Sequence, residues 1–176
     1  MSDLNQLWNA AADAFDQRYQ AATDAAQEQP TPCAEWKVRD LVAHAVGVQA
    51  AFGGALGAGT AEDADWPTAR DAMRAALAAP GATDGTAFYA GFGGEVPKAM
   101  LISVATTDLL VHTWDLARAL GVDATLPAES AAAALASLQS LPAEVLRAPG
   151  RFGAEVEVPA DADPQTRLLA FAGRQP

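Results

Sequence analysis

The sequence predicts an all-α protein, mainly a helical bundle with long loops and a short C-terminal appendage, and three observations predict it. Apolar residues recur at three- and four-residue steps along most of the chain, which is the period of an amphipathic helix. Segments rich in Gly and Pro separate these stretches, and strand signals are almost absent. A length of 176 residues, 51% of them hydrophobic, suits one domain with a substantial core. We therefore expect a single domain over residues 1–176, with 148–176 as a short C-terminal extension.

The first half of the chain is expected to form three helices. Apolar side chains at helical spacing predict the first over residues 3–27, and the two prolines of EQPTPCAEW end it. A second helix is expected over residues 38–52, with Asp40 in its first turn, where a negative charge complements the helix dipole. Pro67 suits the first position of a third helix, over residues 67–79.

The second half begins with PGATDGTAFYAGFGGEVP, whose five glycines and two prolines predict a long loop or a small hairpin. A fourth helix is expected over residues 97–120. A fifth, in PAESAAAALASLQSLPAEVLR, is interrupted at Pro142. The tail is expected to hold a short strand over Ala154–Val158 and a final helical turn near Arg167–Ala172.

Charge and cysteine content limit the class of protein. The formal net charge of −11 argues against binding to nucleic acid or to anionic membranes, because both need a basic face. No apolar segment approaches the roughly 18 residues that span a bilayer. Cys33 is the only cysteine, so an intrachain disulfide and a Cys-rich metal cage are excluded. With an acidic N-terminus that lacks a signal-peptide pattern, the sequence predicts a soluble, cytoplasmic monomer or homodimer.

The segment TTDLLVHTWDLARAL, residues 106–120, places three ionisable side chains on one side of the fourth helix. Taking Asp108 as zero, His112 lies at roughly 40° and Asp115 at roughly −20° around the helix axis. The rest of this helix is apolar almost all the way round, which is typical of a central helix with its polar strip turned inward.

His44, the only other histidine, lies in the apolar stripe of the second helix, so both histidines are expected inside the bundle. Because burying unpaired carboxylates costs several kcal/mol, these groups need partners. A divalent cation held by His44, Asp108 and His112 satisfies them and leaves one position open, as in catalytic sites. Asp115 is expected to orient a ligand or a bound water. The alternative is a core hydrogen-bond network in which an aspartate orients a neutral His112 without a metal.

The segments TPCAEWKVRDLVAHAVG, LLVHTWDLARALG and PQTRLLAFAGR resemble the actinobacterial family of mycothiol-dependent maleylpyruvate isomerase N-terminal-domain proteins, within the wider group of DinB-like metal-binding four-helix bundles. The resemblance implies a DinB-like bundle with a zinc-type site. Nickel and iron are the alternative metals. Its ligands correspond to His44, Asp108 and His112. The isomerase has glutamate where this chain has Asp108, and it has a further C-terminal domain, so maleylpyruvate isomerisation itself is not expected.

The family resemblance further implies a thiol S-transferase-like activity, in which the metal accepts mycothiol or another low-molecular-weight thiol and makes it react with an electrophile. Two other hypotheses remain open: a non-catalytic metal-binding stress or accessory protein, and a metal-free structural bundle. Trp36 and Trp114 are candidates to wall the pocket or to be plain core. Arg118 is a candidate to contact an anionic cofactor or to form a surface salt bridge. Cys33 is interpreted as a small buried side chain rather than a nucleophile.

Overall fold

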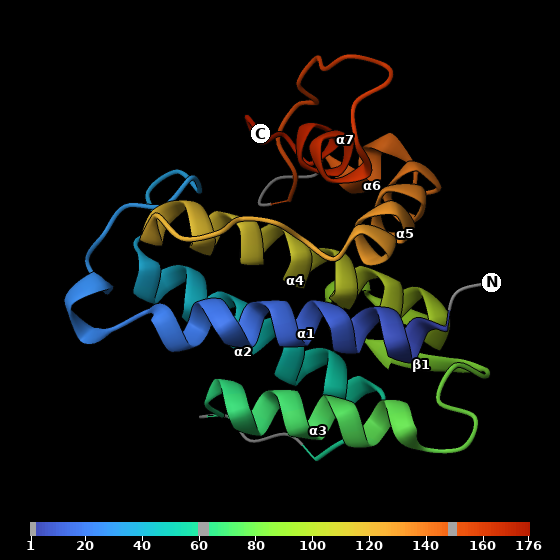
Figure 1. Cartoon of the computed structure of the whole chain (residues 1–176). Helices are drawn as coiled ribbons and strands as arrows, with labels where there is room; N and C mark the ends of the chain where they lie inside the picture. The colour runs from blue at the N-terminus through green and yellow to red at the C-terminus, as the bar shows by residue number, and fades with distance from the viewer. Residues whose placement is uncertain (1–2, 60–63, 148–150) are drawn as a thin grey trace.

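The computed structural model describes residues 3–59, 64–147 and 151–176, and this part of the chain is mainly α-helical, as predicted (Figure 1). One antiparallel hairpin, β1 (Thr86–Tyr89) and β2 (Gly94–Pro97), precedes the longest helix. The described helices are α1 (Leu4–Ala21), α2 (Val38–Ala55), α3 (Trp66–Ala78), α4 (Lys98–Leu120), α5 (Ala128–Gln139), α6 (Ala143–Leu146) and α7 (Pro164–Phe171), with the 3-10 turns η1 (Asp24–Ala26) and η2 (Ala90–Phe92). None of these helices combines the length and the apolar character needed to cross a membrane.

Helix α4 lies at the centre, packed against α1, α2 and α5. Figure 1 shows α3 along one side of the bundle next to α2, and α5, α6 and α7 gathered on the opposite side, beyond α4. Most side chains of α4 are buried, which agrees with its apolar surface on nearly all sides. The predicted polar strip of α4 therefore lies inside the protein rather than on its outer surface.

A buried hydrogen-bond chain fixes the register of α1, α2 and α4. The indole Nε1 of Trp8 donates to Gln49 Oε1 at 2.9 Å, and Gln49 Nε2 donates to the carbonyl of Ala105 at 3.0 Å. All three residues are fully buried, so each bond forms in a low-dielectric interior where an unpaired polar group is costly. Gln49 follows His44 in α2 and Ala105 precedes Asp108 in α4, each within about one and a half turns, so this register brings His44 close to Asp108.

The predicted boundaries of α3 and α4 hold to within about one residue, α2 continues to Ala55 rather than ending at residue 52, and the end of the first helix differs most. The first helix ends at Ala21 rather than at residue 27, because the chain turns through η1 toward α2, where Val38 donates its N–H to Gln29 at 2.9 Å. The capping of α2 uses Asp40, whose carboxylate accepts the backbone N–H of Lys37 at 3.0 Å. The Gly-rich segment forms the small hairpin rather than an irregular loop.

The prediction of a strand over Ala154–Val158 is wrong. The segment is extended, but among the described residues it pairs with no strand, and its Val156 N–H donates to the carbonyl of Ala170, within α7, at 3.0 Å. The backbone of this segment therefore meets a helix instead of a neighbouring strand. Helix α7 is longer than the predicted turn because Asp163 caps it, accepting from the N–H groups of Gln165 and Thr166. Residues 148–150, where the predicted extension begins, lie outside the described residues.

Candidate metal centre

Helices α2 and α4 bring His44, Asp108 and His112 together. Asp108 Oδ1 lies 3.6 Å from Nε2 of His44 and 3.6 Å from Nε2 of His112. The two imidazole rings approach edge to face, with centroids 4.9 Å apart. The candidate ligand atoms of all three residues lie within 4.8 Å of one another. The structure therefore gathers the three predicted ligands in one place, from two helices that meet in the bundle.

The spacing of these atoms fits a cation better than direct hydrogen bonds. At 3.6 Å, both imidazole–carboxylate distances are longer than a good N–H···O bond. Two ligand atoms on one tetrahedral zinc ion lie about 3.4 Å apart, given metal–ligand distances of about 2.0–2.1 Å. Asp108 Oδ2 is buried and accepts no hydrogen bond from the described residues. Because an orphaned carboxylate oxygen is costly to bury, the donor set fits a divalent cation.

The exposure of the three side chains differs, and this gives the centre an open side. His112 is 10% exposed and Asp108 20%, whereas His44 is 34% exposed. The expectation that both histidines lie inside is met by His112, while His44 lies at the rim of the core because α2 turns the flank of its apolar stripe to solvent. His44 is therefore the ligand candidate most accessible to solvent.

Asp115 lies on the far side of the His112 ring. Its Oδ2 is 3.1 Å from Nδ1 of His112, and its side chain is fully buried. Burial raises the pKa of Asp115, but hydrogen bonds from His112 and from Arg174 outweigh burial and lower the pKa below its ordinary value. An ionised Asp115 keeps a proton on Nδ1, which leaves Nε2 directed toward Asp108.

The same surroundings make His112 basic in the metal-free protein. Burial alone lowers the pKa of His112, but the charge of Asp108 and hydrogen bonds to Asp115 and Cys33 raise it from 6.5 to about 10. At neutral pH both nitrogens of the His112 ring therefore carry a proton, unless a cation replaces the proton on Nε2.

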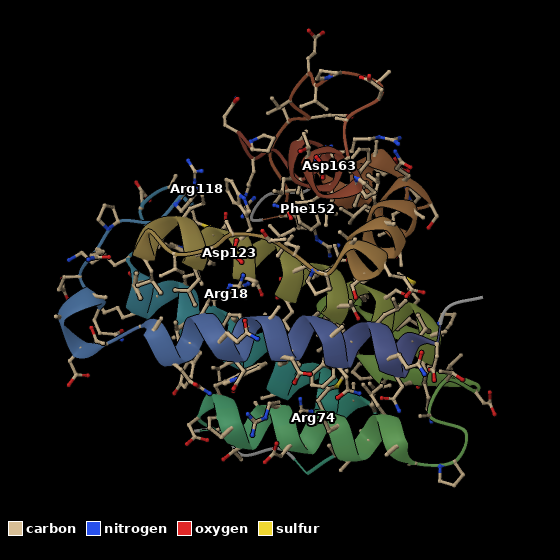
Figure 2. The ribbon with its side chains drawn as sticks, in the orientation of Figure 1. Arg18, Arg74, Arg118, Asp123, Phe152 and Asp163 are labelled. Atoms are coloured by element: carbon tan, nitrogen blue, oxygen red, sulfur yellow. The ribbon has the colours of Figure 1, made fainter. Side chains whose placement is uncertain are left out.

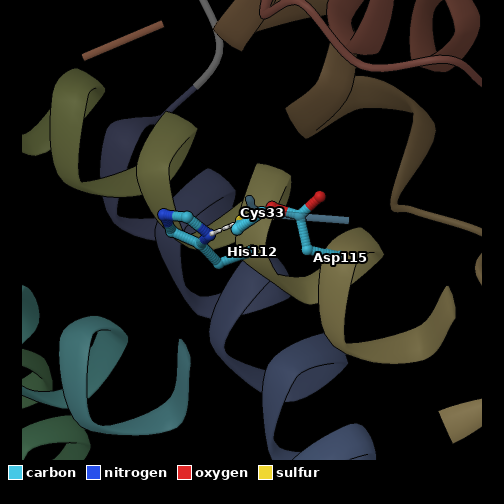
Figure 3. Close-up of side chains that lie close together, drawn as sticks. All are labelled: Cys33, His112 and Asp115. Atoms are coloured by element: carbon cyan, nitrogen blue, oxygen red, sulfur yellow. Dashed lines mark hydrogen bonds and ion pairs between the residues drawn. The ribbon is translucent and has the colours of Figure 1, made fainter. Parts of the chain in front are cut away.

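Cys33 and Arg174 complete the surroundings of Asp115. Cys33 Sγ lies 3.2 Å from Asp115 Oδ2 and 4.0 Å from His112 Nδ1, and Figure 3 shows the three side chains converging. Arg174 Nη2 lies 2.8 Å from Asp115 Oδ2 and 3.4 Å from Cys33 Sγ. Although Cys33, His112 and Asp115 are spaced like metal ligands, the guanidinium already supplies the positive charge there, which disfavours a second cation.

The aromatic candidates divide into two groups. The ring of Trp36 lies 4.7 Å from that of His44 and 5.8 Å from that of His112, so Trp36 covers one side of the centre. Trp114 is buried in the core, and the Arg118 guanidinium lies 5.4 Å above its ring. Figure 2 shows Arg118 extending outward from α4. The contacts of the described residues link neither Trp114 nor Arg118 to the three candidate ligands.

The hairpin adds a residue that the sequence did not single out. The Tyr89 ring stacks on Phe52 of α2 with centroids 4.7 Å apart. Burial raises the pKa of Tyr89, and the negative charge of Asp108 raises it further, while Arg151 opposes the shift.

Sequence reasoning also missed the roles of Cys33 and Arg174. Cys33 precedes His112 by 79 residues and Arg174 follows Asp115 by 59, so no local pattern joins them. One signal was present: a buried aspartate next to a histidine requires a further cationic partner, and PQTRLLAFAGR ends in an arginine after an apolar helix.

Comparison with known proteins identifies the family. The model of the mycothiol maleylpyruvate isomerase N-terminal domain matches residues 8–69, which include Cys33, Trp36 and His44. Two uncharacterized proteins from two strains of Mycobacterium tuberculosis are each 36% identical over 155 residues, covering 82% of this chain and 83% of each relative. No solved structure shows significant similarity. The chain belongs to the mycothiol maleylpyruvate isomerase N-terminal domain family.

Proposed function

We propose that the protein binds a divalent metal, zinc foremost, and acts as a thiol S-transferase-like enzyme. The observation that carries this proposal is the convergence of His44, Asp108 and His112, together with the buried Asp108 Oδ2, which accepts no hydrogen bond from the described residues. Two imidazoles and one carboxylate suit zinc, and also nickel or iron, whereas calcium and magnesium prefer oxygen ligands alone.

Three protein ligands and an accessible rim support a catalytic rather than a closed structural centre. A divalent cation, when bound, supplies a positive charge that lowers the pKa of a coordinating thiol. The chain's own residues do the rest. Asp115 fixes the His112 ring, and Trp36 excludes water from one side of the centre. The exposed flank of His44 leaves room for a thiol and an electrophile to meet.

The thiol we propose is mycothiol or a similar low-molecular-weight thiol, on the strength of the matching family's name. We place the activity in the cytoplasm, where free thiols stay reduced. The electrophile is a small molecule that forms a bond to the thiol sulfur. In a substitution its leaving group departs as this bond forms, and in an addition its double bond takes up the thiol proton.

The deciding experiment combines elemental analysis with a thiol-dependent assay. Protein purified without chelator is expected to carry about one zinc, nickel or iron ion per chain. It should consume thiol with a panel of electrophiles, and stripping the metal should abolish that turnover. Metal without turnover favours the non-catalytic accessory protein, and absence of stoichiometric metal favours the structural bundle.

Metal affinity should rise with pH because the cation and a proton compete for His112. The proton leaves His112 only near pH 10 in the metal-free protein, so below that pH each binding event releases one proton. The apparent dissociation constant is expected to fall about tenfold per pH unit between about pH 7 and about pH 9. Zinc titration against a chromophoric chelator, corrected for the chelator's own protonation, measures this slope. A pH-independent constant contradicts the assignment of His112 as a ligand.

A further inference from the structure

We infer that Arg174, in the C-terminal tail, is a positioning residue for the metal centre and acts through Asp115. The inference rests on the proposed metal binding and assigns part of the centre to a segment outside the helices that carry the ligands. Arg174 does not touch the candidate ligands' metal-facing atoms. It holds the Asp115 carboxylate in place, and this carboxylate orients the His112 ring.

The contact between Arg174 and Asp115 is a two-point clamp. Arg174 Nε lies 3.1 Å from Asp115 Oδ1 and Nη2 lies 2.8 Å from Oδ2. Paired donors on both oxygens prevent rotation of the carboxylate, which a single-point contact does not. The Asp115 side chain is fully buried and that of Arg174 is 15% exposed, so solvent screens this pair little.

The clamped carboxylate in turn sets the orientation of His112. Asp115 Oδ2 is the atom that faces His112 Nδ1 at 3.1 Å, and the same oxygen accepts from Arg174. On the opposite edge of the ring, Nε2 faces Asp108. An unbroken path therefore runs from the C-terminal tail to the ring nitrogen proposed to bind metal. Such outer partners of metal-binding histidines typically contribute 10–100-fold in metal affinity.

The end of α7 is shaped to deliver Arg174 to this place. The N–H of Gly173 bonds to the Ala170 carbonyl at 3.0 Å and that of Arg174 to the Leu169 carbonyl at 2.8 Å, which is the Schellman pattern. Gly173 has φ 81°, and a Cβ there lies only 2.8 Å from Gly153 Cα, so glycine is required. The chain thus reverses at Gly173 and directs Arg174 back toward α4.

The test compares three arginine substitutions in the full-length protein. Arg174→Gln removes the charge and the two-point clamp, and zinc affinity is expected to fall about tenfold. Arg174→Lys keeps the charge without the fork and should recover part of that loss. Arg147→Gln is the matched control, because Arg147 also anchors the tail, through the carbonyls of Gly153 and Phe171, without touching Asp115. It should bind zinc as the wild type does.

A double-mutant comparison separates positioning from a general loss of stability. In an Asp115→Asn background, Arg174→Gln should have almost no further effect on zinc affinity, because the path is already weakened. Three results overturn the inference while leaving the metal centre in place. The losses of zinc affinity in Asp115→Asn and Arg174→Gln could be additive, or Arg147→Gln and Arg174→Gln could lose affinity equally. Wild-type affinity in both Arg174 variants is the third. A wild-type protein that binds no zinc overturns the proposed function and this inference with it. Melting temperatures of the metal-free variants identify any that fail to fold.

Discussion

His112→Ala is expected to lose stoichiometric metal, with a fall in zinc affinity of at least about 100-fold. The substitution removes the Nε2 ligand that faces Asp108 and leaves two protein ligands, one of which, His44, is a third exposed. It also releases Asp115 from its hydrogen bond with the ring. Both effects act in the same direction. Elemental analysis of wild type beside His112→Ala, followed by competition with a chelator, gives the size of the loss.

The control for this result is Thr113→Ala, the next residue on α4. Thr113 is fully buried, and its hydroxyl donates to the Leu109 carbonyl at 2.7 Å, so its loss perturbs the same helix without touching the centre. We expect this variant to bind zinc normally. If His112→Ala retains one ion per chain at wild-type affinity, the cation is not held by the α2–α4 site. If both variants lose metal, the loss reports the state of the helix rather than the missing ligand.

The helices were predictable because each leaves a local record in the sequence. Gly121 ends α4 in the left-handed conformation with φ 67°, and Pro67 lies in the first turn of α3, as their types predict. The prediction of a strand over residues 154–158 was wrong because alternating apolar and polar residues describe only one of the two segments that a strand pairing needs. Whether a second strand lies beside the segment depends on the rest of the fold, and here α7 lies there instead.

The candidate centre was predictable only where it is local. Helical geometry alone puts Asp108 and His112 on one strip, since four residues make just over one turn. The distance from His44 to Asp108 depends on how α2 and α4 slide past each other. That register is fixed by Gln49 and the carbonyl of Ala105, a contact with no sequence pattern of its own.

The contact between Arg174 and Asp115 could not be predicted from local sequence patterns. Arg174 reaches Asp115 because α7 packs on α5 and α5 packs on α4, so the contact depends on two helix interfaces in succession. The sequence indicated only that a buried Asp115 needs a partner beyond His112. It did not indicate which of the chain's arginines supplies it.

Asp115→Ala is expected to destabilise the metal-free protein by about 3–5 kcal/mol. The change leaves Arg174 without its carboxylate in a mostly buried position, and it removes the partner of His112 Nδ1. The contact between Cys33 Sγ and Asp115 Oδ2 is lost as well. Urea denaturation in the presence of a chelator measures the free energy of unfolding without a contribution from bound metal.

Two further variants show whether the loss comes from the buried charge. Asp115→Asn keeps the size of the side chain and one acceptor oxygen, so it should cost less than alanine. Asp123→Ala removes a carboxylate that also pairs with an arginine, Arg18, but this carboxylate is 75% exposed and Arg18 keeps backbone carbonyl partners (Figure 2). That variant should lose far less stability than Asp115→Ala, because solvent screens an exposed ion pair. Equal losses for Asp115→Ala and Asp123→Ala contradict the account, because they make burial irrelevant to what the carboxylate contributes.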